Sequence, residues 1–205
     1  MIGYEGGGEM ECTVIILAGG QSRRMGTNKA LLPVEGETVI SRIVKEARRL
    51  DGEILLVTNQ PKEYEFLHLP HAGDLREGMG PLAGLEAGLL VSKTEKNLLL
   101  ACDVPFFQAG IGKRLLHYLD HYELAVPVAE GRRHPLCAAY RKSLLPTIQK
   151  TLDAGQRRMD SLLDTAKVKL VKGENPHYFF NMNTKEDYQR IKAIHKGEGH
   201  EISSD

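Results

Sequence analysis

Short apolar runs separated by helical patterns constrain the fold of this chain more than any other feature. Three runs, "CTVIILA" at 12–18, "EILLVT" at 53–58 and "NLLLACD" at 97–103, have the length and composition of buried strands. The segment 38–50, between the first two runs, has helical periodicity instead. Strands that alternate with helices are typical of βαβ units. The sequence therefore predicts an α/β fold with a mostly parallel sheet.

The remaining elements are predicted from the same periodicities and from the start and stop signals of helices. Six apolar side chains share one face of the helix at 38–50, namely Val39, Ile40, Ile43, Val44, Ala47 and Leu50. Further helices are predicted at 61–68, 80–93, 108–122, 143–155 and 184–197. Further strands are predicted at 123–129, 134–140, 167–173 and 178–183, and turns at 31–37 and 130–133. Thr184 and Asp187 have the spacing of a capping box at the start of the last helix.

The length and charge of the chain set limits on its organisation and partners. A chain of 205 residues fits one domain, which we expect at 12–197 between flexible tails at 1–11 and 198–205. Lys plus Arg equals Asp plus Glu, 27 against 27, which argues against a general nucleic-acid or membrane-surface binder. No apolar run reaches about 18 residues and no signal peptide is visible. We therefore expect a cytoplasmic protein whose anion sites are local. We also expect a monomer, which these features do not test.

The three cysteines do not indicate a disulfide or zinc framework. Cys12, Cys102 and Cys137 each lie in an apolar context, their number is odd, and no C-x-x-C spacing occurs. We interpret them as small buried hydrophobic residues in a reducing compartment.

The loop "LAGGQSRRMGTNKALL" at 17–32 gathers glycines and cations directly after the first predicted strand. It matches neither the P-loop, which needs G-x-x-x-x-G-K-[ST], nor the G-x-G-x-x-G dinucleotide fingerprint. Glycines nevertheless let backbone N–H groups approach phosphate oxygens, and Arg or Lys adds charge. An ordinary strand-to-helix turn with surface cations is the alternative. In a parallel sheet, this loop and "CDVPF" at 102–106 lie where ligands bind, beyond the carboxyl ends of the strands.

The same loop resembles the nucleotide-binding signature of small nucleotidyltransferases, L-A-[GA]-G-x-S-x-R-M-G-x-x-K. Its double glycine is most similar to the MobA-type molybdenum cofactor guanylyltransferases, whereas related cytidylyltransferases tend to have L-A-A-G. Five later segments resemble family motifs in the family's order: "GDLREGMGPLAGLEAGL", "LLLACDVPF", "RRHPLCAAY", "AGQRRM" and "FFNMNTKEDY". The resemblance covers about residues 12–190 and implies a Rossmann-like three-layer sandwich of the nucleotidyltransferase type.

The resemblance implies roles for residues of the first loop. Backbone contacts to the nucleotide would come from Leu17, Ala18, Gly19 and Gly20. Lys29 would lie on the triphosphate and offset the charge that shifts as pyrophosphate leaves. Arg24 would also face phosphate, whereas Arg23 is expected on the surface. Many relatives have Asp before the loop lysine, but this chain has Asn28.

The resemblance also implies a magnesium site and a base-recognition residue. Asp103 ends an apolar strand and would hold Mg²⁺, a hard cation that prefers carboxylate, phosphate and water oxygens. From the residues alone, Asp103 could equally cap the next turn. Asp74 would contact the nucleotide, and its carboxylate could accept from both N–H groups on the edge of guanine. Asn59 also ends a strand near this pocket, where a turn role is an equal alternative.

The second half of the chain is expected to recognise the acceptor. Asn181 and Asn183 alternate along the strand predicted at 178–183, so both would point to one face. They could bind a ligand or tie down the next helix, and the resemblance favours the ligand. Arg157 and Arg158 suit an anionic pterin phosphate, with solvated arginines as the alternative. Arg132, Arg133 and His134 form another basic patch, in which we expect His134 to be structural.

The resemblance therefore implies a Mg²⁺-dependent enzyme that transfers GMP from GTP to the phosphate of molybdenum-bearing molybdopterin. Carrier proteins for the cofactor are further implied partners. Two alternatives stay open. One is a related nucleotidyltransferase that uses CTP or another phosphorylated acceptor. The other is a non-catalytic module that binds the nucleotide or the cofactor.

Overall fold

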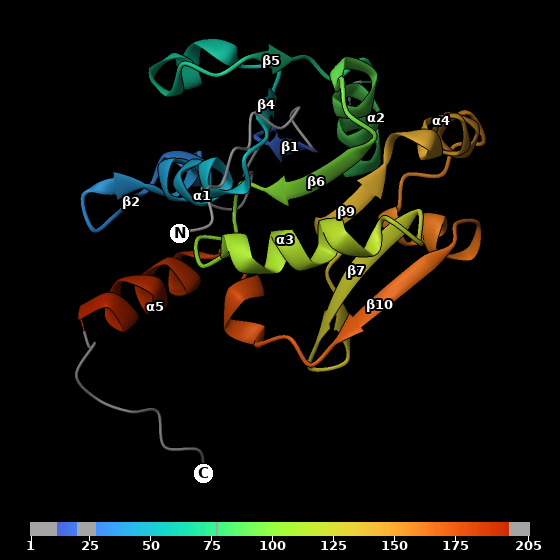
Figure 1. The fold of residues 1–205 in the computed structure, drawn as a ribbon. Helices are drawn as coiled ribbons and strands as arrows, with labels where there is room; N and C mark the ends of the chain where they lie inside the picture. The colour runs from blue at the N-terminus through green and yellow to red at the C-terminus, as the bar shows by residue number, and fades with distance from the viewer. Residues whose placement is uncertain (1–11, 20–27, 77, 197–205) are drawn as a thin grey trace, which may run out of the picture.

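The computed structural model describes residues 12–19, 28–76 and 78–196. In this part of the chain, eight strands form one sheet in the order β10–β7–β9–β6–β1–β4–β5, with β8 beside β7 (Figure 1). The strands are β1 Cys12–Leu17, β4 Glu53–Val57, β5 His71–Ala72, β6 Lys96–Ala101, β7 Leu124–Ala129, β8 Arg132–Arg133, β9 Cys137–Arg141 and β10 Val168–Lys172. The α-helices are α1 Val39–Ala47, α2 Pro81–Val91, α3 Ala109–Tyr118, α4 Leu145–Asp153 and α5 Lys185–Lys196. This arrangement confirms the predicted α/β class.

Most ladders of the sheet are parallel, as expected for strands connected through helices. β1 pairs in parallel with β4 and β6, β4 with β5, and β10 with β7. β9 runs antiparallel to both β6 and β7. β9 therefore joins the strands of the first half of the chain to those of the second half.

Alternate side chains of β1 enter two separate apolar layers. Val14 and Ile16 belong to the layer that includes residues of α1 and α3, whereas Ile15 and Leu17 belong to the layer that includes residues of α2 and α4. All four are at most 9% exposed, so β1 is buried on both faces. This explains why the sequence of β1 is continuously apolar rather than alternating. Helices on both faces of one sheet give the three-layer sandwich that the resemblance implies.

Helix α2 lies very close to β1 because it has glycine where the two elements meet. A Cβ built on Gly88 would lie 2.5 Å from Cγ2 and 2.9 Å from Cδ1 of Ile15, whose side chain is fully buried. Ile15 is β-branched and has little rotamer freedom, so it cannot move aside cheaply. The internal glycines of α2 therefore serve packing, which offsets their low helix propensity.

We expect Gly88→Ala to lower the free energy of unfolding by about 1–3 kcal/mol because it overpacks this contact. The matched control is Gly110→Ala in α3, where an added Cβ meets nothing within 4 Å. The control should leave stability unchanged or raise it by up to about 1 kcal/mol, since alanine is the better helix former. Urea unfolding followed by circular dichroism measures both. Equal stability of the two variants would contradict the packing explanation.

Several predicted segments differ from the structure. The segment 178–183 is not a strand: its first residues belong to the 3₁₀-helix η6 (Pro176–Phe179), and the chain then runs extended outside the sheet. Asn175 caps η6 through its side chain, which accepts from the N–H of His177. The N–H of Met182 bonds to the carbonyl of Asp103 rather than to a neighbouring strand. The helix predicted at 61–68 is likewise a 3₁₀-helix, η3 (Pro61–Leu67).

Both predicted turns contain short strands. The turn at 130–133 is too long, because β8 begins directly after Glu130 and Gly131, which turn the chain with φ of 48° and 72°. The turn at 31–37 contains a hairpin. Its two strands are β2 Pro33–Val34 and β3 Glu37–Thr38.

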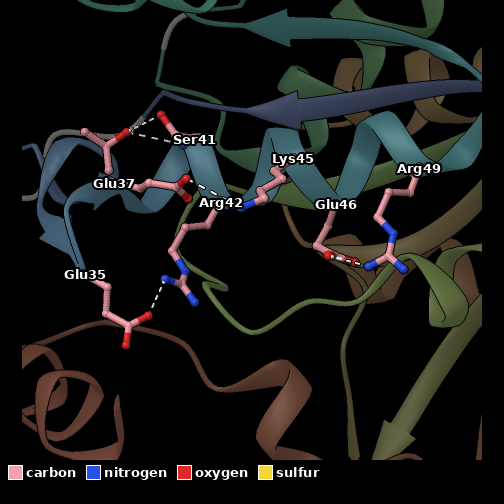
Figure 2. Close-up of polar contacts among 8 residues, drawn as sticks. Glu35, Glu37, Ser41, Arg42, Lys45, Glu46 and Arg49 are labelled. Atoms are coloured by element: carbon pink, nitrogen blue, oxygen red, sulfur yellow. Dashed lines mark hydrogen bonds and ion pairs between the residues drawn. The ribbon is translucent and has the colours of Figure 1, made fainter. Parts of the chain in front are cut away.

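Ion pairs join this hairpin to helix α1, as Figure 2 shows. Arg42 Nη1 lies 3.0 Å from Glu35 Oε2, and Lys45 Nζ lies 3.5 Å from Glu37 Oε1. Pairs of this exposure contribute about 0–1 kcal/mol each. These ion pairs orient the hairpin relative to α1. The apolar face of α1 holds the helix on the sheet.

Glu46 joins α1 to α3. Its Oε2 accepts a hydrogen bond of 2.8 Å from the N–H of Ala109, the first residue of α3. The preceding residue, Gln108, makes no capping bond of its own. Glu46 therefore caps α3 from another helix and holds the end of the loop that follows Asp103.

The predicted capping box of the last helix is confirmed. The N–H of Thr184 bonds to Asp187 Oδ2 at 2.8 Å, and the N–H of Asp187 bonds to Thr184 Oγ1 at 3.1 Å. No helix in the described ranges has the length and apolar content needed to cross a membrane.

Candidate active site

A cavity of about 930 Å³ opens at the carboxyl ends of β1, β4 and β6. Its lining includes five residues singled out in the sequence for nucleotide or metal binding: Leu17, Ala18, Gly19, Asp74 and Asp103. Asn59, Gln60 and Cys102 also line it. Cavities that bind small molecules commonly measure about 300–1,000 Å³. The predicted residues therefore surround a space that fits a nucleotide, at the edge of the sheet where such folds bind ligands.

Asp103 lies just after β6 and faces this cavity. The neighbouring N–H of Cys102 bonds to the carbonyl of Leu17 at 3.1 Å, so the ends of β6 and β1 are held together. The carbonyl of Asp103 accepts from the N–H of Met182 at 2.9 Å, which anchors the segment after η6 beside the site. The backbone of Asp103 thus connects a residue of the first half with a segment of the second.

Burial raises the pKa of the Asp103 carboxyl above its ordinary value, while the ammonium group of Lys29 acts in the opposite direction. Burial also raises the pKa of the Cys102 thiol to about 12, which keeps that neighbour neutral. In the described residues, no cation lies within 4 Å of the Asp103 carboxylate. A carboxylate at a cavity offers the oxygen ligands that hard divalent cations prefer.

Lys29 begins the 3₁₀-helix η1 (Lys29–Leu31). Its Nζ donates to Asn183 Oδ1 at 3.3 Å across 154 positions of sequence. The structure therefore brings a residue expected at the triphosphate together with a residue expected at the acceptor. Gly20, Arg23 and Arg24 lie outside the described residues.

Asp74 is held by neighbours on both sides. Its N–H donates to Asn59 Oδ1 at 2.8 Å, and its Oδ1 accepts from the N–H of Arg76 at 2.9 Å. Asn59 thus holds the loop that carries Asp74, and it also lines the cavity.

The guanidinium of Arg76 fixes the loop that carries Asp74. Its Nε donates to Glu86 at 2.9 Å and its Nη1 to Asp153 at 2.6 Å, so one side chain joins this loop to α2 and α4. Glu86 is only 3% exposed, and a buried carboxylate needs such a partner. None of the sequence motifs described above predicts these bonds of Arg76. The available signal was a glutamate in the otherwise uncharged segment of α2.

Asn181 and Asn183 are exposed on either side of the buried Met182. The expectation that both point to one face was based on a strand, and the segment is not a strand. Arg157 lies beside the loop of the nucleotide cavity, where its Nη1 donates to the carbonyl of Gly78 at 3.4 Å. The side chain of Arg158 is exposed.

His134 packs against an aromatic ring near the second basic patch. Its ring stacks on Phe179 with centroids 4.6 Å apart. Burial and the nearby charge of Arg132 lower the pKa of His134, which favours the neutral ring. This packing supports the structural role expected for it.

The donor set fits a cation that is held mainly by a substrate. No group of three or more His, Cys, Asp or Glu side chains in the described residues is arranged to enclose a metal. Asp103 supplies one hard carboxylate at the cavity, and Mg²⁺ commonly binds through one or two carboxylates plus phosphate and water. The residues present therefore fit a magnesium ion that arrives with a nucleotide.

Comparison with known proteins agrees with this geometry. A crystal structure of molybdopterin-guanine dinucleotide biosynthesis protein A from Archaeoglobus fulgidus superposes with a TM-score of 0.76 at 23% identity, covering 90% of this chain and 98% of that one. The two proteins therefore share a fold. Residues 14–170 match the family model of the MobA-like NTP transferase domain, and the chain belongs to this family.

Two curated relatives cover nearly the whole chain. The probable molybdenum cofactor guanylyltransferase of Carboxydothermus hydrogenoformans is 38% identical over 89% of this chain and 95% of its own length. The molybdenum cofactor guanylyltransferase of Desulfosudis oleivorans is 32% identical over 90% of this chain and 96% of its own length. This chain is a nucleotidyltransferase, as the family resemblance of the loop at 17–32 implies.

Proposed function

We propose that this enzyme transfers GMP from GTP to the terminal phosphate of molybdenum-bearing molybdopterin. The observation that carries the proposal is the meeting of Asp103, Asp74 and the backbone of 17–19 around one nucleotide-sized cavity. The names of two relatives, which describe guanylyl transfer to the molybdenum cofactor, support the choice of GTP and molybdopterin as substrates. We also propose that 12–197 works as one unit and as a monomer, with the nucleotide in its first half and the acceptor in its second.

In this reaction an oxygen of the acceptor phosphate attacks the α-phosphorus of GTP. The bond from that phosphorus to the bridging α–β oxygen breaks, and pyrophosphate leaves with the electron pair. No covalent enzyme intermediate is needed, because a phosphate monoester is already anionic near neutral pH. The chain contributes by orienting both phosphates and by stabilising the charge that moves.

Four features of the chain divide this work. The backbone at 17–19 approaches the nucleotide, and Lys29 offsets charge on the departing pyrophosphate. Arg24, which lies outside the described residues, is proposed to act on the phosphates as well. Asp103 holds Mg²⁺, which when bound supplies Lewis-acid polarisation of the phosphate oxygens. Asp74 accepts hydrogen bonds from the N–H groups of guanine.

The acceptor is proposed to lie along the segment after η6. Asn181 and Asn183 project from this segment to solvent, and Lys29 contacts the second of them. Arg157 and Arg158 supply positive charge for the acceptor phosphate. Arg157 lies beside the nucleotide cavity, because its side chain bonds to the carbonyl of Gly78, which lines that cavity.

The test is calorimetric titration of the protein with GTP, CTP and ATP in Mg²⁺, followed by an assay of pyrophosphate release with molybdopterin as acceptor. GTP should bind preferentially, and Asp74→Asn should weaken its binding about tenfold or more because guanine loses a charged acceptor. Asparagine can still accept from the N–H of Arg76, so the loop should keep its shape.

Two other outcomes would replace the proposal with a defined alternative, and a third would overturn it. Preference for CTP would indicate a cytidylyltransferase. Tight GTP binding without pyrophosphate release, in the presence of acceptor, would indicate a non-catalytic binding module. Failure to bind any of the three nucleotides, with or without acceptor, would overturn the proposed function.

A further inference from the structure

Asn28 forms a three-point junction beside Lys29. Its Oδ1 accepts from the N–H of Ala30 at 3.1 Å, which caps η1. Its Nδ2 donates to Glu63 Oε2 at 2.5 Å and to Tyr64 Oη at 2.8 Å. The side chain of Asn28 thus accepts one hydrogen bond within the turn that carries Lys29. It donates to two residues of η3, which lie 35 and 36 positions later in the sequence.

Helix η3, which receives the bonds from Asn28, carries a buried tyrosine and directly follows residues that line the nucleotide cavity. Tyr64 is only 4% exposed, and burial raises the pKa of its hydroxyl to about 12, so the group stays neutral. Helix η3 begins directly after Asn59 and Gln60, which line the cavity. The junction therefore ties the start of the lysine turn to the element that follows β4.

The partners of this residue require an amide. Aspartate could still cap η1, but it has no donor for Glu63 and would place two carboxylates about as close as the present hydrogen bond. Like charges at such a distance repel, even where solvent screens them. Alanine would remove all three bonds without adding charge.

We propose that Asn28 is the positioning residue of Lys29, and that Glu63 makes an amide necessary there. By capping η1 and holding it to η3, Asn28 directs the lysine ammonium toward the nucleotide phosphates. This inference rests on the proposed function of Lys29. Asn28 itself contacts no reacting group.

The experiment compares wild type, Asn28→Asp, Glu63→Gln and the double variant Asn28→Asp/Glu63→Gln. Kd for Mg·GTP is measured by calorimetry at low and high salt, and kcat and KM by pyrophosphate release. Asn28→Asp should weaken Mg·GTP binding roughly tenfold, and high salt should reduce the defect. Glu63→Gln alone should bind nearly as wild type, because Asn28 can donate to the amide oxygen of the introduced glutamine.

The double variant is decisive, because the glutamine introduced on η3 can donate to the aspartate introduced before Lys29 and restore the junction. Its Kd should return to within a few-fold of wild type, and thermal unfolding should find all four proteins folded. Wild-type behaviour of Asn28→Asp, or an equal defect in Asn28→Asp and the double variant, would overturn the positioning role alone. If wild type neither binds Mg·GTP nor releases pyrophosphate, the proposed function fails and this inference fails with it.

Discussion

Asp103→Ala should abolish guanylyl transfer while the protein stays folded. The substitution removes the carboxylate that fits Mg²⁺ at the cavity, and metal stabilisation of phosphate charge is worth several kcal/mol. We therefore expect turnover to fall at least about 10³-fold. Pyrophosphate release at saturating GTP and Mg²⁺ measures the loss, and circular dichroism checks the fold. A folded variant with near-full activity would show that Asp103 has no essential role in the reaction.

Asp103→Asn provides a second check, because it separates charge from shape. Burial raises the folded-state pKa of Asp103, so ionisation in the folded protein is opposed. Stability therefore falls as pH rises from the unfolded-state pKa, about 3.9, through the raised folded-state pKa. In buffer without metal or nucleotide, the asparagine variant should have the higher Tm at pH 7. The difference should shrink as the pH is lowered below about 4, and a variant less stable than wild type at pH 7 would contradict this explanation.

Lys29→Ala should impair both nucleotide binding and the chemical step. A hydrogen bond to a charged group contributes about 1.5–3 kcal/mol, so Kd for Mg·GTP should rise roughly ten- to hundredfold. Loss of a cation that stabilises the leaving pyrophosphate should lower kcat by a further factor of about 10². Calorimetry and steady-state kinetics measure the two effects separately.

The control for Lys29 is Lys45→Ala on helix α1. The side chain of Lys45 is 72% exposed and pairs with Glu37, away from the nucleotide cavity. This variant loses the same charge and should keep wild-type kinetics. If both lysine variants bind Mg·GTP equally well, Lys29 has no specific role in binding.

The sequence could predict the elements that carry an uninterrupted apolar signal. The runs that became β1, β4 and β6 are buried on both faces, so composition alone identified them. The residues at their carboxyl ends then followed from the geometry of a parallel sheet. This is why the loop after β1 and the segment after β6 could be expected at one edge of the sheet, whereas the family resemblance singled out Leu17, Ala18, Gly19 and Asp103 within them.

Features that depend on tertiary contacts could not be predicted in the same way. The segment 178–183 has the aromatic and alternating pattern of a strand, but its backbone bonds to Asp103 instead of a sheet neighbour. The ion pair of Arg76 with Glu86 joins two elements whose proximity no local pattern encodes. The same is true of the bonds from Asn28 to η3.

The contact between Lys29 and Asn183 has a consequence for the synthesis of the enzyme on the ribosome. Translation makes Lys29 first, and the amide of Asn183 that accepts its hydrogen bond is added 154 positions later. Domains generally fold as units. The nascent chain therefore cannot make this contact until translation has passed Asn183. A message cut short before the codon for Asn183 will yield a protein with its lysine present and its acceptor side incomplete.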